Sequence, residues 1–177
     1  VDLNMFNHES YGIMLDIKES FEFLGARHGV RGTYGEDRKN IGKTSKHFCQ
    51  TFKNMEKPPA MVLKTGSDGS ISEQENLIEK INTIRSMVKG KLPQLYLVSG
   101  NLSDTGVNQL YRDPKIKAMV SFTKGEGFGR PLAEFALTKK PIIVSNWSGH
   151  TDFIKPEFAV LLGGNLKNIH DSAAWEN

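Results

Sequence analysis

The chain has 177 residues, which suits one well-packed globular unit and is short for two. A hydrophobic fraction of 38% and a charged fraction of 24% are ordinary for a soluble protein, and no apolar stretch approaches the roughly 18 residues needed to cross a bilayer. The 23 basic and 20 acidic residues give a net charge of +3, too small a bias to indicate a nucleic-acid-binding surface.

The single cysteine, Cys49, permits no internal disulfide, so a reducing, cytoplasmic setting is the simpler expectation. Cys49 lies on an apolar helical stripe with Phe48 and Phe52, which indicates a core thiol and not a nucleophile. The sequence shows no secretory signal peptide, and neither end carries a start-like or stop-like pattern. We therefore expect a piece truncated at both ends relative to a full enzyme.

In chain order, apolar and partly β-branched runs alternate with segments of helical periodicity. Strands are predicted at 21–24, 61–63, 95–98, 118–122, 142–144 and 159–162, and helices at 41–55, 72–88, 104–111 and 130–138. This alternation predicts an α/β fold: a doubly wound, mostly parallel, Rossmann-like sheet of about six strands with helices on both faces. Residues 1–18 lack a clear period and are interpreted as an approach segment or interdomain piece.

Several details of these helices are open to test. Met55 completes the predicted apolar stripe of the first helix, and Ile78 belongs to that of the second. Ser72 is predicted to open the second helix with a capping box. The Gly42-Lys43-Thr44 triplet lacks the earlier glycine of a phosphate-binding P-loop, because Asp37 stands there, so Lys43 is expected to be exposed.

Loops rich in glycine and small polar residues follow five of the predicted strands. In an open α/β sheet the carboxyl ends of the strands face one crevice, and ligands bind there. A ligand with phosphates and hydroxyls would suit such loops. They are 31–40, 64–69, 99–101, 123–131 and 145–150.

The turn at 123–131 carries the most specific pattern. Its glycines, Gly125, Gly127 and Gly129, let the backbone approach a ligand, and the start of the following helix offers unpaired N–H groups to an anion such as a pyrophosphate. Glu134, one turn into that helix, is expected at the cleft rim, where it could accept two ribose hydroxyls. Glu126, in the turn itself, could hold sugar hydroxyls or face a developing positive charge.

The run from Glu126 to Glu134, EGFGRPLAE, followed by Lys140-Pro141 and a strand, resembles the E-x7-E signature of retaining GT-B glycosyltransferases, the glycosyl transferases of group 1. The resemblance covers about residues 20–163 and implies that 19–177 form the C-terminal, nucleotide-sugar-binding domain of such an enzyme. It implies that Glu126 contacts the transferred sugar and that Glu134 holds the ribose. The turn residues Gly127, Phe128, Gly129, Arg130 and Pro131 would bind the diphosphate.

The family also has a basic pair after the first strand of this domain. By resemblance Lys39 neutralises the donor phosphates, which makes it a catalytic candidate together with Glu126. The partner arginine of the family falls at Thr33 here, so Arg31 or Arg38 would have to replace it.

The segment after the fifth predicted strand supplies further candidates. Ser148, Gly149 and His150 could line the cleft near the nucleotide or the sugar. Asp152 is expected to cap the short helix it opens, and Trp147 is expected to pack, although it could stack on a base.

The resemblance implies transfer of a sugar from a nucleoside diphosphate sugar to an acceptor hydroxyl with retention of configuration. No cofactor or metal is expected, since no D-x-D triplet is present and Lys39 with the helix start would stabilise the leaving diphosphate. The acceptor would bind to an N-terminal domain absent from this sequence, so the isolated domain is expected to transfer little. A nucleotide-sugar epimerase or hydrolase, or a non-catalytic nucleotide-sugar-binding module, stays open as an alternative.

Overall fold

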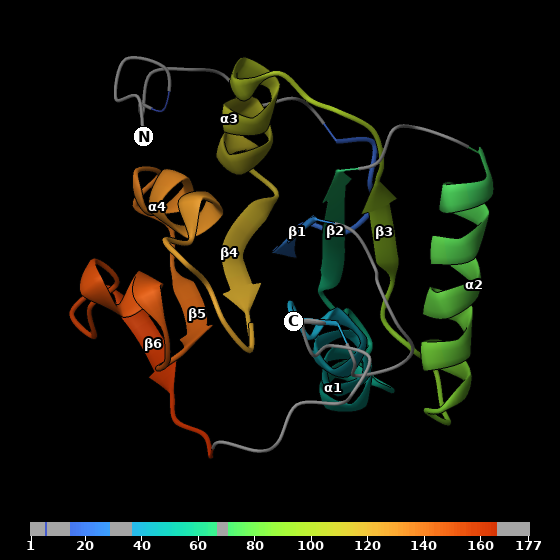
Figure 1. Ribbon diagram of the computed structural model, residues 1–177. Helices are drawn as coiled ribbons and strands as arrows, with labels where there is room; N and C mark the ends of the chain where they lie inside the picture. The colour runs from blue at the N-terminus through green and yellow to red at the C-terminus, as the bar shows by residue number, and fades with distance from the viewer. Residues whose placement is uncertain (1–5, 7–14, 29–36, 67–70, 166–177) are drawn as a thin grey trace, which may run out of the picture.

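A computed structural model describes residues 6, 15–28, 37–66 and 71–165. In the described residues, six strands form one sheet in the order β3-β2-β1-β4-β5-β6, and every neighbouring pair is parallel (Figure 1). The predicted α/β class, with its six strands and four helices, is confirmed. The elements are β1 (Glu22–His28), α1 (Ile41–Phe52), β2 (Ala60–Gly66), α2 (Ile71–Ser86), β3 (Leu95–Val98), α3 (Asp104–Arg112), β4 (Ile116–Ser121), α4 (Arg130–Ala136), β5 (Ile142–Ser145), the 3-10 turn η1 (Gly149–Asp152) and β6 (Ala159–Leu162).

Helices cover both faces of the sheet, as predicted. Successive side chains of a strand point to opposite faces, and β2 shows this directly: Val62 belongs to one buried cluster, whereas Met61 and Leu63 belong to the other. The first cluster includes side chains of α3 and α4, and the second includes side chains of α1 and α2. Burial on both faces explains the continuous apolar run 60–63 in the central strand β2, whereas β6, at the edge of the sheet, exposes Val160 and Leu162.

The strand order reverses direction between β1 and β4, which lie side by side at the centre of the sheet. The chain leaves β1 toward β2 on one side and leaves β4 toward β5 on the other. In open α/β sheets the connections that follow two such strands diverge, and ligands bind in the crevice outside the carboxyl ends of the strands. The segments 37–40 and 122–129 lie at this point.

Three details of the helices differ from the expectation. Met55 is 44% exposed because α1 ends at Phe52, and Ile78 is 50% exposed on the solvent side of α2. Ser72 is not the cap of α2, because that helix already begins at Ile71.

The expectations for Cys49 and Lys43 are confirmed: Cys49 is fully buried, and Lys43 is exposed. Burial raises the pKa of the Cys49 thiol, although the charge of Arg85 partly opposes this, so the reactive thiolate is disfavoured.

Part of the amino-terminal segment packs on the same core as the sheet. Phe6 and Ile17 are buried, and the Phe6 ring lies 6.5 Å from that of Tyr111. The ammonium of Lys115 donates to the carbonyls of Leu15 and Ile17. Residues 1–5 and 7–14 lie outside the described part, so the interpretation of 1–18 as an approach segment or interdomain piece stays a prediction.

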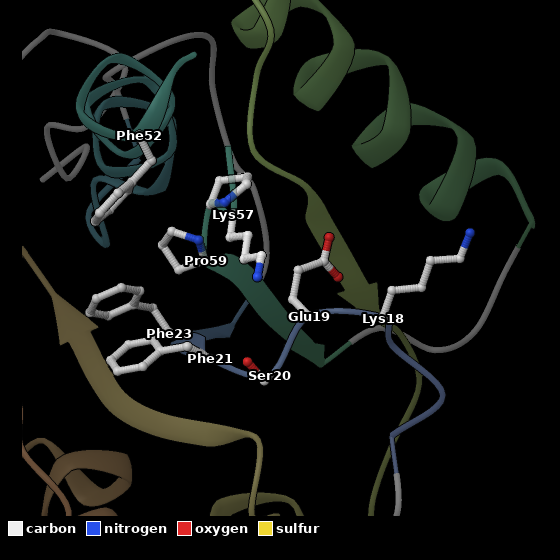
Figure 2. A pocket seen from close by; sticks show the side chains of 9 residues that line it. Lys18, Glu19, Ser20, Phe21, Phe23, Phe52, Lys57 and Pro59 are labelled. Carbon is white, nitrogen blue, oxygen red and sulfur yellow. The ribbon is translucent and has the colours of Figure 1, made fainter. Parts of the chain in front are cut away.

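The opposite, amino-terminal edge of the sheet carries a pocket of about 550 Å³ (Figure 2). It is lined mainly by Phe21, Phe23 and Phe52 with Pro58 and Pro59, and Lys57 extends along it. None of the predicted site residues lines it. The polar crevice of the loops and this apolar pocket are therefore separate places.

Across the described ranges, no helix combines the length and the apolar character that crossing a membrane would need.

Glu22, the first residue of β1, is a buried acid without a partner. Its side chain is fully buried, and neither carboxylate oxygen has a hydrogen bond. Burial, with the nearby charge of Asp113, raises the pKa of Glu22 from 4.5 to about 7, although Lys115 partly opposes the shift. Folding therefore favours the protonated acid.

This raised pKa predicts a stability gain for Glu22→Gln that depends on pH. The unfolded chain ionises near pH 4.5 and the folded chain near pH 7, so the wild type loses stability as pH rises between these values and stays lower above them. The variant cannot ionise, so its advantage should reach at most about 3 kcal/mol at pH 8. That advantage should disappear at pH 4. Urea unfolding of both proteins at the two pH values checks this, and an equal difference at both would contradict it.

Candidate functional site

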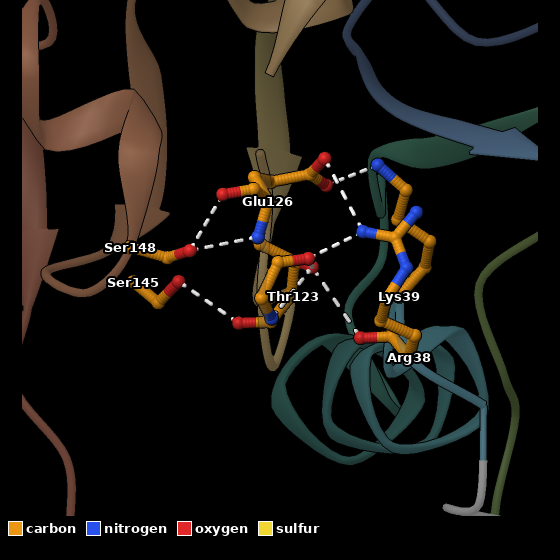
Figure 3. Close-up of polar contacts among 7 residues, drawn as sticks. Arg38, Lys39, Thr123, Glu126, Ser145 and Ser148 are labelled. Atoms are coloured by element: carbon orange, nitrogen blue, oxygen red, sulfur yellow. Dashed lines mark hydrogen bonds and ion pairs between the residues drawn. The ribbon is translucent and has the colours of Figure 1, made fainter. Parts of the chain in front are cut away.

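Three chain segments meet at the switch point between β1 and β4. They are 37–40 before α1, 123–129 after β4, and 145–150 after β5 (Figure 3). The N–H of Lys124 donates to the carbonyl of Arg38 at 2.8 Å, and the Ser145 hydroxyl donates to the carbonyl of Thr123 at 3.1 Å. The turn after β4 is therefore held from both sides.

The start of α1 fixes the first segment. Asp37 is buried and accepts the N–H of Ile41 at 2.8 Å, which satisfies one of the free donors at the beginning of the helix. Asn40 adopts a left-handed conformation with φ 56°, which asparagine tolerates better than most residues. The cap and the turn together place Arg38 and Lys39 directly before the helix, facing the segment after β4.

Glu126 lies between two cations. The Lys39 ammonium contacts one carboxylate oxygen, and a guanidinium nitrogen of Arg38 lies 3.3 Å from the other (Figure 3). The side chains of Glu126 and Lys39 are 7% and 10% exposed, whereas that of Arg38 is 58% exposed. Burial alone would raise the pKa of Glu126, but the hydrogen bond and charge of Lys39, with those of Arg38, outweigh it and lower that pKa. Glu126 is therefore an anion at neutral pH.

Ser148 and Gly149 hold the backbone of Glu126. The Ser148 hydroxyl lies 2.8 Å from the N–H of Glu126 and 2.7 Å from its carbonyl, and the N–H of Gly149 donates to the same carbonyl at 3.1 Å. Ser148 has φ 83° and ψ −176°, a region that favours glycine and costs another residue about 1–3 kcal/mol. This strained conformation is what brings the hydroxyl against Glu126.

His150 packs against the turn after β4. It is fully buried, and its Nε2 lies 2.7 Å from the carbonyl of Ser145, so this nitrogen carries the proton. A side chain at Gly129 would come within 3.1 Å of the His150 Cβ, and Gly129 has φ 83°. His150 therefore packs behind the glycine turn, closed to solvent in this structure, and its role in the cleft stays a prediction.

The turn also presents free amides. The N–H groups of Gly127, Phe128 and Gly129 donate to no other described residue. Successive unbonded amides form a concavity that suits an anion. The Phe128 side chain is exposed and its ring lies 4.9 Å from that of Phe153, while Pro131 occupies the first turn of α4 as predicted.

Glu134 is not grouped with Glu126. Its side chain is only 5% exposed, one carboxylate oxygen accepts the Nε of Arg130 at 2.5 Å, and the Tyr111 hydroxyl lies 3.4 Å from the other. The open carboxylate expected at the cleft rim is therefore covered. The structure brings Lys39, Arg38 and Glu126 together with Ser148 and Gly149, and it leaves Glu134 in a separate cluster.

Other residues differ from the expectation or were missed by it. Trp147, expected to pack, is 51% exposed, and Asp152 ends η1, which Ser148 precedes, so Asp152 is not its cap. Thr123 and Ser145 were predicted only as members of the loops 123–131 and 145–150, and their roles in holding the turn were not predicted. Tyr111 and Asp104 carried no signal, because their contacts join α3 to α4 across a distance in sequence.

No protein-family model and no curated protein matches the chain. Several solved structures match the chain. The C-terminal domain of a glycosyl transferase group 1 family protein, LpcC from Francisella tularensis, matches with a TM-score of 0.62 at 17% identity over 92% of this chain and 80% of that one. The lipopolysaccharide outer core galactosyltransferase WaaB matches with 0.54 at 17% identity over 89% and 40%. Anabaena HepE, solved with UDP-glucose, matches with 0.51 at 15% identity over 82% and 35%.

The likeness is one of fold. At these identities it shows that the chain has the Rossmann-like architecture of GT-B C-terminal domains. The chain spans most of the first solved domain but well under half the length of WaaB and HepE.

Gly149→Ala should dislodge the turn. A Cβ at this position would stand 1.7 Å from the carbonyl oxygen of Gly127, so the backbone at 126–127 must move. We expect a loss of about 1–3 kcal/mol in unfolding free energy, typical of overpacking, with amide resonance shifts concentrated at 126–129. Urea unfolding and amide NMR spectra check this. Gly125→Ala is the matched control, because no described atom lies within 4 Å of its Cβ position; equal losses in both variants would refute the contact.

Proposed function

We propose that this chain is the nucleotide-sugar-binding domain of a retaining glycosyltransferase of group 1. The observation that carries the proposal is the cluster at the switch point, where Glu126 is held between Lys39 and Arg38 beside the free amides of 127–129. The E-x7-E resemblance and the fold of the solved glycosyltransferase domains support it. An acid for the sugar and cations for the diphosphate lie within one crevice.

The diphosphate would bind Lys39, Arg38 and the turn amides. Without a ligand, the two cations are paired with Glu126. A diphosphate brings stronger acceptor oxygens and more negative charge, so the cations can turn toward it while staying close to the carboxylate. Arg38 takes the role of the family arginine absent at Thr33. Arg31 and Thr33 lie outside the described residues.

Glu126 would then face the transferred sugar. When the bond from the sugar C1 to the diphosphate oxygen breaks, positive charge develops on the ring, and a fixed anion nearby stabilises it. The electrons stay on the diphosphate, where Lys39 and Arg38 offset the new charge. The acceptor hydroxyl bonds to C1 on the face that the diphosphate leaves, and its proton passes to the departing diphosphate oxygen, so the configuration is retained. Because cations already sit at the leaving group, we propose a metal-independent reaction.

The acceptor side belongs to the same proposal. An N-terminal domain of the full enzyme would bind the acceptor, and the protein would act in the cytoplasm. Nucleotide-sugar binding by this chain is the first test. Thermal-shift measurements with UDP-, GDP- and ADP-sugars should show stabilisation by one of the three, and no shift with any of them would remove the proposal.

Lys39→Ala should weaken binding of the matching nucleoside diphosphate by about tenfold or more, since a charged hydrogen bond contributes about 1.5–3 kcal/mol. Isothermal titration of this chain measures it. Lys43→Ala is the matched control, because Lys43 is an exposed lysine on the adjoining helix and should bind like the wild type.

A double variant separates phosphate binding from an indirect effect. Lys39→Ala alone leaves the buried Glu126 with less compensation, which could disturb the turn. Lys39→Ala with Glu126→Gln removes both charges. If Lys39 binds phosphate, the double variant should stay as weak as the single one; full recovery would show that the unpaired carboxylate caused the loss.

A further inference from the structure

The second acid of the E-x7-E pair is closed to any ligand in this structure. Arg130, the first residue of α4, lies over Glu134 and donates its Nε to one carboxylate oxygen. Another nitrogen of the same guanidinium reaches Asp104 at the start of α3, at 3.1 Å. Arg130 thus bridges two helices above a carboxylate that is itself buried.

A ribose could not use Glu134 in this arrangement. A carboxylate that holds a vicinal diol must offer oxygen lone pairs to two hydroxyls. One oxygen of Glu134 is taken by Arg130, and the Tyr111 hydroxyl approaches the other from the core side. Each oxygen keeps a further lone pair, but the Glu134 side chain is only 5% exposed beneath Arg130, so the arginine must move before a diol can reach it.

The contact between Arg130 and Asp104 can break at little cost in free energy. Arg130 is 62% exposed and Asp104 is 52% exposed, so their contact is hydrated and screened by salt. The hydrogen bond and charge of Glu134, followed by the charge of Asp104, raise the pKa of Arg130, which keeps it charged at any ordinary pH. The bridge therefore responds to a competing ligand and not to titration of the arginine.

We propose that Arg130 is a latch that competes with the ribose diol of the nucleotide for Glu134. This inference rests on the proposed function. Binding of the diol would require the guanidinium to leave both Glu134 and Asp104, so that the bridge between the two helices breaks. The measured affinity for a nucleotide with an intact ribose is then the intrinsic affinity multiplied by the fraction of molecules in which the latch is open. The affinity for a nucleotide without the diol is not lowered in this way, because its binding does not require the latch to open.

The test is the ratio of two affinities. Titration calorimetry with the nucleoside diphosphate that binds (UDP, GDP or ADP) and with its 2′,3′-dideoxy counterpart gives the preference for the diol. Both probes carry the same phosphates, so the ratio cancels any general effect of removing a positive charge. In Arg130→Ala the preference for the diol should rise about three- to tenfold over the wild type.

Two further variants keep the test decisive. Asp104→Asn weakens the bridge without touching Glu134 and should raise the preference in the same direction, and it carries the test if Arg130→Ala does not fold. Glu134→Gln should reduce the preference toward equality. An unchanged or smaller preference in both Arg130→Ala and Asp104→Asn, with binding intact, overturns the latch alone. A wild type that binds none of the three nucleoside diphosphates overturns the proposed function, and the latch fails with it.

Discussion

The candidate site depends on the hydrogen bonds that hold the turn after β4 against the segment after β5. Glu126 is bonded to Ser148 through both its N–H and its carbonyl, and Gly149 approaches so closely that no side chain fits between them. Ser148 adopts a conformation that serine rarely takes, so the surrounding contacts must hold it there. This fixed backbone lets Glu126 aim its carboxylate at the opposite wall of the crevice.

The candidate site also depends on the ion pair between Glu126 and Lys39. A carboxylate with 7% of its side chain exposed is costly to ionise, and the ammonium of Lys39 offsets this cost from the facing segment. The same arrangement stores positive charge where a diphosphate would arrive. Two cations face one acid, so a net positive charge is left for an anion, and these charges are in place before any ligand binds.

The two glutamates of the E-x7-E motif differ in their surroundings although they belong to one turn and one helix. Glu126 meets cations from a different part of the chain, whereas Glu134 meets the arginine four residues before it and a tyrosine from α3. One acid is therefore tied to the crevice and the other to the packing of α3 against α4. A buried hydroxyl and an exposed guanidinium give Glu134 one fixed neighbour and one that can be exchanged.

Hydrophobic periodicity and turn chemistry are local properties of the chain, so they were enough to predict the alternation of strands and helices, the parallel sheet and the loops that carry the polar residues. The sequence also indicated Glu126 through its place in the glycine turn, and it indicated Lys39, with Arg31 or Arg38 beside it, only through the resemblance to a known family. The apolar pattern did not predict the end of α1 or the exposed side of α2: Met55 lies beyond α1, Ile78 lies within α2, and both are exposed to solvent. The tertiary structure alone decided which charges meet. The partners of Glu126 are 87 and 88 residues away, and Asp104 and Tyr111 reach α4 only because α3 packs beside it, so no local pattern encodes these contacts.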